Sequence, residues 1–595
     1  MGKRALVFCV FLAAFSIAVD CGLAGDGVAA IHAIQGDGQY SPLVSRTVTI
    51  EAVVTGDFGG QDKLKGFFVQ EEDSDADNKD ETSEGIFVYD PRSLAKYENI
   101  LSGDLIEVTG KVSEYNNLTQ ITLNRVEKVG QEMSQEVTAA RITLPFKNEK
   151  FLERYEGMLV ELPQKCIITA NDDFSAYGEK TISPDARLSI PTNTAKPGKP
   201  ASSVQAKNDR SKLILDDGSK QKYPETDPFP RTLRSGDSVQ GIVGILSYDF
   251  GKYRIEPVSI SRISISNPRP ERPESVGGRI AVASINVNNY FNGDGKGGGF
   301  PTSRGAESKE AFDRQRTKII EAISDMKADV IGLMEIENDG YGELSAIRDL
   351  TNGLNAYRAK QTGTKYSFID PGLSRLGNDD ISVGLIYDSS KIRPVGKAMT
   401  RSTEAFRTNN RQPLAQTFEE ISTGEIFTVI VSHLKSKNQP EDIGQLEAEN
   451  MDKGDGQGYW NGARTNAAND LVSWLSTDPT QSGDPDYLIL GDMNSYNYED
   501  PITAFKNAGY EDLMQAYVGP DSYTYGFDGQ WGELDHALAN INMAQQISGA
   551  TIWHINADES SAFGYAGKWS SSDRYRCSDH DPLIVGLNLN RRQNP

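Results

Sequence analysis

A carboxylate and a carboxamide follow directly after a short apolar run in the last quarter of the sequence. Residues 487–490 (Tyr-Leu-Ile-Leu) are expected to form a buried strand, Gly491 ends it, and Asp492 and Asn494 come next. Because strand side chains alternate, residues two apart project from the same side. Such a pair of oxygen donors suits a hard cation or a phosphate group, although Gly, Asp and Asn are also common at ordinary strand exits.

Several other expected strands in the same region also end in acidic, amide or imidazole side chains. These are Asn286, Glu335, His433, Asp535 with His536, and Asp579 with His580. The chain has five His, and three of them fall in this set. One such residue at a strand end is usually structural, but so many ends in one region indicate a shared site.

The elements that would position these residues alternate between strand and helix from Arg279 onward. Strands are expected at 280–286, 329–335, 383–387, 427–431 and 487–490, and helices at 309–327 and near 463–475. This alternation predicts a layered α/β domain.

Composition sets limits on the rest of the chain. A length of 595 residues predicts two to four domains. The formal net charge is −23, so a polyanionic substrate would need a local basic patch to attract it. Of the four Cys, Cys166 and Cys577 lie beyond the N-terminal region, and the sequence leaves open whether they form a disulfide.

Residues 1–24 are expected to be a secretory signal peptide. Lys3 and Arg4 precede an apolar run, residues 5–19, which is short for a membrane helix. We therefore expect a bacterial protein exported to the periplasm or the extracellular space, with no membrane span in its mature form.

Residues 28–135 are expected to form an all-β domain. Candidate strands lie at 48–54, 66–69, 85–89, 104–109 and 119–123. Their order and the run 103–121 resemble the OB-fold, which often binds single-stranded nucleic acid. The strongly acidic composition favours the alternative, a barrel with a structural role.

One loop of this region has the carboxylate spacing of a calcium-binding loop. Asp73, Asp75, Asp77 and Glu84 occupy its first, third, fifth and twelfth positions, and Asn78 stands where Gly is usual. No helices are expected to flank it, so a solvated acidic hairpin is the favoured alternative.

Residues 141–266 are expected to form a second β-rich, OB-like domain, with clear strands at 157–162 and 237–246. Residues 191–230 are polar and rich in Pro, and predict a long excursion without evident chemistry. A Pro-rich linker is expected at 267–278 and a catalytic domain at 279–591. A fragment that begins near residue 268 would then fold and work alone.

The polar strand ends resemble those of the endonuclease/exonuclease/phosphatase superfamily, the fold of DNase I and exonuclease III. Two motifs carry the resemblance, Gly491-Asp-x-Asn494 and Ser578-Asp-His-x-Pro582, and it spans residues 279–589. The whole chain resembles secreted bacterial nucleases with an OB-fold ahead of this domain. Further matching runs are 289–300, 411–414, 455–458 and 553–559. The resemblance implies a four-layer α/β sandwich, preceded by one or more all-β barrels.

Hydrolysis of a phosphodiester needs a hard cation, an activated water and charge stabilisation. Glu335 is the best candidate metal ligand, with Asn286 and Asp579 beside it. Oxygen ligands favour Mg²⁺ or Mn²⁺, with Ca²⁺ as a further candidate, over Zn²⁺.

Roles for the remaining strand-end residues combine this chemistry with the resemblance. His580 is the expected general base or transition-state ligand, and the resemblance implies that Asp535 fixes its tautomer. His433 would be a second acid/base oriented by Asp380. Asp492 and Asn494 would orient water and phosphate. Five basic residues are expected to hold a DNA backbone: Arg375, Arg411, Lys435, Lys437 and Arg464.

The expected function is that of a secreted, metal-dependent nuclease acting on DNA, with RNA left open and no obligate protein partner. One alternative is a phosphatase, 5′-nucleotidase or sphingomyelinase-type phosphodiesterase, because a fold does not fix its substrate. Another is a non-enzymatic binding protein, which would lack the catalytic residues that this sequence retains.

Overall fold

The computed structural model describes residues 23–24, 27–77, 79, 81–92, 99–224, 229–359 and 365–590. Nearly all of the expected signal peptide and Asn78 of the expected calcium loop lie outside the described residues. The chain forms two compact units. The first comprises Met1–Ala140, Lys150–Val160 and Gly244–Tyr253, and the second comprises Arg141–Glu149, Glu161–Val243 and Arg254–Pro595. None of the helices in the described ranges combines the length and apolar composition needed to cross a membrane.

The first unit contains a closed five-stranded barrel. Its strands are β3 (Thr47–Phe58), β4 (Gly66–Gln70), β5 (Gly85–Tyr89), β6 (Leu105–Tyr115) and β7 (Leu118–Lys128). They follow the order β3-β4-β5-β7-β6, and β5 pairs with β7 in parallel. Ile50, Val69 and Ile121 are among the apolar residues that fill the interior. All five strands predicted for this region are present.

The expected calcium loop does not bring its carboxylates together. Asp73 accepts hydrogen bonds from the backbone and hydroxyl of Thr138, at 3.0 and 2.6 Å. Asp77 accepts a hydrogen bond from the Thr82 hydroxyl at 3.1 Å, and Asp75 is exposed. The four-carboxylate site is therefore wrong for this loop, because Asp73, Asp77 and Glu84 bind different partners.

Glu84, the fourth member of the expected calcium site, lies instead beside His32. Its Oε2 is 3.0 Å from His32 Nδ1, and Glu71 Oε2 lies at the same distance from that nitrogen. Burial and the adjacent Glu84 carboxyl raise the pKa of Glu71 to about 9.

The second β-rich region is built on six strands in one sheet. In sheet order they are β10 (Lys180–Pro184), β12 (Leu213–Leu215), β14 (Lys252–Ser264), β13 (Ser238–Asp249), β9 (Leu159–Ala170) and β8 (Ala140–Arg141). Strand β10 also pairs with β9, so the sheet curls back on itself. The long excursion between β10 and β12 has secondary structure of its own. It contains β11 (Leu188–Ser189), α3 (Pro191–Thr194) and α4 (Lys199–Asp209), and we call residues 188–209 the wall segment.

The C-terminal region contains two six-stranded mixed sheets. The first is ordered β17 (Tyr366–Phe368), β18 (Ile381–Asp388), β16 (Val330–Glu337), β15 (Ile280–Tyr290), β28 (Leu583–Leu587) and β27 (Ile547–Ile552). The second is ordered β19 (Ile392–Thr400), β20 (Leu414–Glu420), β21 (Ile426–His433), β22 (Tyr487–Asp492), β26 (Asp535–Asn540) and β23 (Tyr510–Asp512). The strands predicted from Arg279 onward are all present, most of them longer than expected.

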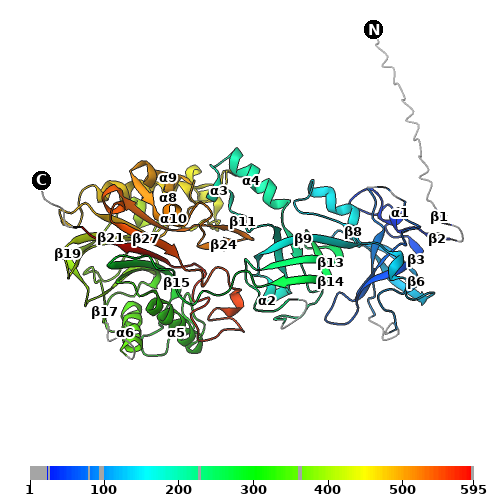
Figure 1. The fold of residues 1–595 in the computed structure, drawn as a ribbon, viewed down its shortest axis with the longest axis horizontal. Helices are drawn as coiled ribbons and strands as arrows, with labels where there is room; N and C mark the ends of the chain where they lie inside the picture. The colour runs from blue at the N-terminus through cyan, green and yellow to red at the C-terminus, as the bar shows by residue number, and fades with distance from the viewer. Residues whose placement is uncertain are drawn as a thin grey trace, which may run out of the picture. The chain divides into compact units, whose positions relative to one another are not determined.

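One apolar core lies between these two sheets, and helices cover their outer faces (Figure 1). Val282 and Leu385 of the first sheet pack with Val429 and Leu490 of the second. Helices α5 (Lys309–Met326) and α6 (Ala346–Arg358) pack on the first sheet, and α8 (Asn461–Leu475) and α9 (Asp500–Asn507) pack on the second. The predicted layered α/β domain is thus present, and its sheets place their polar strand ends close together.

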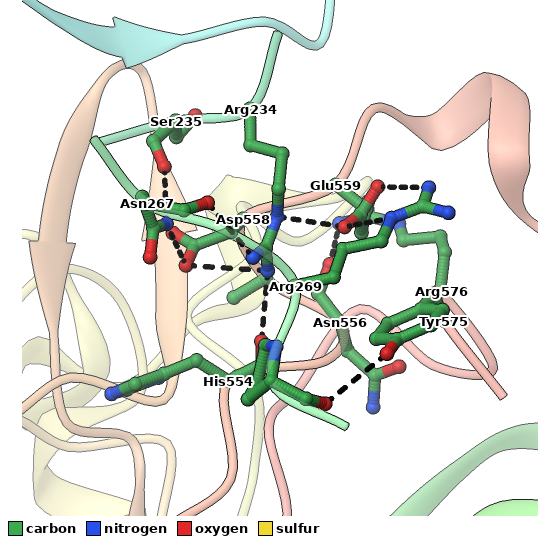
Figure 2. Close-up of polar contacts among 12 residues, drawn as sticks. Arg234, Ser235, Asn267, Arg269, His554, Asn556, Asp558, Glu559, Tyr575 and Arg576 are labelled. Atoms are coloured by element: carbon green, nitrogen blue, oxygen red, sulfur yellow. Dashed lines mark hydrogen bonds and ion pairs between the residues drawn. The ribbon is translucent and has the colours of Figure 1, made fainter. Parts of the chain in front are cut away.

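Buried charge joins the second β-rich region to the C-terminal region within the second unit (Figure 2). The Asp558 carboxylate is 2.7 Å from a guanidinium nitrogen of Arg187 and accepts a hydrogen bond from Asn267 at the same distance. Arg234 Nε is 2.7 Å from Glu559, which Arg269 also holds through two hydrogen bonds. We call these residues the arginine seam.

The arginine seam bears on two sequence expectations. Residues Asn267 and Arg269 belong to the segment predicted to be a free-standing linker, yet both bind buried carboxylates. A fragment that begins at residue 268 would leave Asp558 and Glu559 without Arg187 and Arg234. The structure therefore argues against a separable catalytic fragment.

Cys166 and Cys577 are both buried and unpaired.

The seam predicts a large cost for removing one of its cations. Arg234 is 3% exposed and Arg231 is exposed. We expect Arg234→Ala to lower the free energy of unfolding by about 3 kcal/mol, because a buried carboxylate loses its partner. Arg231→Ala should have little effect. Equal midpoints for the two variants in denaturant unfolding would contradict the structural role of the seam.

Candidate active site

Two neighbouring parallel strands of the first sheet are irregular at the positions of Asn286 and Glu335. The pairing of β15 with β16 shifts register after Asn286, and that of β16 with β18 shifts between Met334 and Ile336. Glu335 has a φ of 63°, unusual for a residue with a side chain. Bulges of this kind redirect side chains and persist where the surrounding structure holds them.

The Glu335 carboxylate lies in a cluster of oxygen donors. Its Oε2 accepts a hydrogen bond from Asn289 N at 3.0 Å. Burial, and then the Asp579 carboxylate, raise the pKa of Glu335, while Asn286 opposes the rise. The buried Asn286 Nδ2 has no hydrogen-bond partner of normal geometry among the described residues. Two like charges and an amide in a desolvated setting fit a hard divalent cation, which would relieve their repulsion. Glu335, Asn286 and Asp579 are the residues that would hold it.

His580 lies just before β28 and lines the same cavity, next to two buried aspartates. Its Nδ1 is 2.7 Å from Asp535 Oδ2, and its Nε2 is 3.9 Å from Asp492 Oδ2. Burial by itself would lower the pKa of His580, but Asp535, Asp492 and Asp579 together raise it well above its ordinary value. The ring also lies against Tyr525, with centroids 4.7 Å apart. The imidazole is thereby held in one orientation and favoured as the cation.

His433, at the end of β21, has the opposite electrostatic setting. Its Nε2 is 3.5 Å from Asp492 Oδ2 and 3.4 Å from a guanidinium nitrogen of Arg411. Burial, and then Arg411 and His580, hold the pKa of His433 well below its ordinary value. The expected partner Asp380 is wrong, because no hydrogen bond joins it to His433 in the described structure and Asp492 is the carboxylate that faces the ring.

Asp492 therefore lies between two imidazoles with different protonation. Its Oδ1 accepts a hydrogen bond from Asn494 N at 2.9 Å, and the Asn494 amide donates to the Leu434 carbonyl at 3.0 Å. Burial raises the pKa of Asp492 to about 7, against the opposing effect of His580. A carboxylate with this pKa can accept a proton near neutral pH.

Only part of the expected basic patch faces the site. Arg411 and Lys437 line the cavity described below, but the Lys437 ammonium pairs with Glu499. Arg464 is fully buried and donates hydrogen bonds to Ser495 Oγ and to several carbonyls, so its substrate-binding role is wrong. Arg375 is exposed and donates to nearby carbonyls, and Lys435 lies over the Trp460 ring.

These residues open onto one cavity of about 910 Å³. Glu335, Arg411, His433, Asp492, Asn494 and His580 all line it. The cavity also has lining residues that were not expected from the sequence, including Asn289, Arg304 and Tyr525. Asn289 is the first residue of the run 289–300, which resembles that of secreted bacterial nucleases. Arg304 and Arg411 both form ion pairs with Asp379. No motif pointed to Tyr525.

Comparison with known proteins identifies the C-terminal region. The sequence profile of the Endonuclease/Exonuclease/phosphatase family matches residues 283–580, half of the chain, and the protein belongs to this family. A second profile, that of a domain of unknown function named DUF8508, matches residues 148–264. No curated protein matches the sequence.

Solved structures of the family are similar to the chain at low identity. The human Nocturnin catalytic domain with bound sulfate is 17% identical, covers 51% of this chain and 93% of its own, and has a TM-score of 0.33. TDP2 from D. rerio with a single-strand DNA product is 13% identical, with coverages of 51% and 97% and a TM-score of 0.31. A mannosyl-6-phosphatase from Bacteroides thetaiotaomicron is 15% identical, with coverages of 52% and 99% and a TM-score of 0.32. None of the three identifies the substrate of this chain.

The oxygen cluster predicts a stabilising response to Mg²⁺. After removal of metals with EDTA, added Mg²⁺ should raise the melting temperature. At a Mg²⁺ concentration 100 times its Kd, the free energy of unfolding should increase by about 2.7 kcal/mol. Glu335→Gln should abolish most of this rise. Glu337→Gln is a matched control, because Glu337 lies two residues further along β16 and binds Asn292 N. Equal responses in wild type and Glu335→Gln would contradict the assignment.

Proposed function

We propose that the protein is a metal-dependent phosphodiesterase that cuts DNA, with endonucleolytic cleavage as the expected mode. The observation that carries the proposal is the presence of two unlike groups at one cavity. Glu335, which lines the cavity and interacts with the Asp579 carboxylate, forms one group. The imidazoles of His433 and His580, with Asp492 between them, form the other. Family membership supports hydrolysis of a phosphate ester.

A bound Mg²⁺ or Mn²⁺ would neutralise phosphate charge and polarise the phosphorus for attack. The residues of this chain account for the proton transfers. Asp492, with its pKa near 7, takes the proton of the attacking water, and Asn494 helps to place that water. The His580 imidazolium gives its Nε2 proton to the leaving oxygen as the P–O bond breaks, while Asp535 holds Nδ1. Proton transfer from Asp492 to His580 then restores both groups.

Neutral His433 and the guanidinium of Arg411 lie beside this path. Arg411 is held by Asp379 at 3.0 Å and is positioned to stabilise a phosphoryl oxygen. Arg304 reaches the same Asp379 at 3.5 Å and adds a second cation to the cavity. These two residues supply the local positive charge that a protein of net charge −23 needs for a polyanionic substrate.

The fold and the first residues of the sequence support the remaining parts of the proposal. The barrel order β3-β4-β5-β7-β6, with β5 and β7 parallel, supports an OB-fold. The two sheets with helices on their outer faces support a four-layer sandwich. The basic and apolar residues before residue 20 support export from the cell, where extracellular DNA would be the substrate.

Nicking of supercoiled plasmid tests the proposal. We expect wild-type protein to nick the plasmid in the presence of Mg²⁺, and we expect no nicking in EDTA. His580→Ala should lower the nicking rate by about 10²-fold or more, as for removal of a positioned acid/base group. His32→Ala, in the barrel, serves as the control and should cut normally. Full cutting in EDTA would refute metal dependence, and full cutting by His580→Ala would refute the site. Turnover of a phosphomonoester but not of plasmid would favour a phosphatase.

A further inference from the structure

The active-site cavity is shared between the catalytic region and the second β-rich region. Glu335, His433 and His580 are among its lining residues. The wall segment, residues 188–209, lines the same cavity with Ile190, Pro191, Ala201, Ser202, Gln205 and Ala206. A segment that the sequence left without chemistry therefore borders the proposed reaction site.

Buried hydrogen bonds fix the wall segment to the catalytic region. The Thr192 hydroxyl donates to Glu499 at 2.7 Å, and Asn193 Oδ1 accepts from Glu533 N at 3.0 Å. Both Thr192 and Asn193 are buried, and Ile190 N donates to the Trp531 carbonyl at 2.9 Å. The wall is thus preformed.

The same region also positions an aromatic hairpin. Strand β11 pairs in parallel with β25 (Gln530–Gly532), which pairs with β24 (Tyr525–Phe527). The Thr169 hydroxyl donates to the Gly529 carbonyl at 2.6 Å, and Trp531 Nε1 donates to the Thr169 carbonyl at 2.8 Å. Tyr525 lies against His580, and Phe527 lines the cavity while remaining 64% exposed.

The charged lining residues of the cavity come from different parts of the chain. Arg304 and Arg411 lie among the catalytic residues, whereas Asp209 is the charged lining residue contributed by the wall segment. Asp452 is a further lining carboxylate, and Asp528, at the tip of the hairpin, lines the cavity while paired with Lys212 at 2.6 Å. Duplex DNA carries one phosphate charge per about 1.7 Å of its axis, so its neighbouring phosphates would meet these carboxylates. An uncharged planar group such as a nucleobase would not be repelled by these carboxylates.

We infer that Phe527 and the wall segment form a slot for one unpaired nucleobase beside the scissile phosphate. An exposed aromatic ring offers a base a stacking surface, and Pro191, Ala201 and Ala206 line the same cavity with small, uncharged side chains. The slot makes single-stranded nucleic acid the favoured substrate over intact duplex. This inference rests on the proposed phosphodiesterase function and assigns a specificity role to the region matched by DUF8508.

Two esters with the same leaving group test the slot. One is the p-nitrophenyl ester of thymidine 5′-phosphate, and the other is methyl p-nitrophenyl phosphate, which lacks a base. Phe527→Ala should lower kcat/KM for the thymidine ester by about 5- to 100-fold, the range for loss of one base-stacking contact. Its kcat/KM for the methyl ester should stay within about twofold of wild type, because no base is present to stack.

Phe250→Ala is the matched control, since Phe250 is 79% exposed and lies on the turn between β13 and β14. It should change neither ester, and a melting curve should show that both variants fold. On the wall side, Ala206→Trp should lower turnover of the thymidine ester, and Ser203→Trp, on the same helix, should not. Unchanged turnover of the thymidine ester in Phe527→Ala, or equal loss with both esters, would overturn the slot alone. A wild-type protein that cuts neither ester would overturn the proposed function and the slot with it.

Discussion

The site depends on one electrostatic constraint: four carboxylates interact with one another, Asp492 and Asp535 buried, Glu335 and Asp579 half-buried. Asp492 and Asp535 are 2% and 1% exposed, and Glu335 is close enough to Asp579 for the two charges to interact. Charges of one sign in a desolvated cleft require compensation. His580 supplies it for Asp492 and Asp535, and its raised pKa is the result. His580 and Arg411 act on Glu335 from a longer distance, and no ion pair of Glu335 or Asp579 is found among the described residues, so a divalent cation fits there.

Those features of the site that follow from local pattern could be predicted from sequence. Asp492 and Asn494 follow a buried strand, and alternation along β22 places them together. The bulges at Asn286 and Glu335 could not be predicted, because the residue types around them are ordinary for strands. Asp379 and Asp380 are adjacent, and sequence cannot decide which one faces the cleft. The structure points to Asp379, which pairs with Arg304 and Arg411.

The other expectations that the structure contradicts concern side chains whose partners are distant in sequence. Arg464 has the appearance of a phosphate ligand, but its donors serve buried carbonyls of surrounding loops. The carboxylates between Asp73 and Glu84 have the spacing of a calcium loop, but Thr138 and His32 bind two of them. The arginine seam could not be predicted for the same reason, since its members lie up to 371 residues apart, as between Arg187 and Asp558. Spacing along the chain cannot reveal such pairs.

The most direct measurement is the position of a bound cation. Crystals soaked in Mn²⁺ give an anomalous signal that locates the ion independently of activity. The account predicts a peak in contact with Glu335 and Asp579. A peak only at His32, Glu71 and Glu84, or no peak at Glu335 in crystals that bind Mn²⁺ elsewhere, would contradict it.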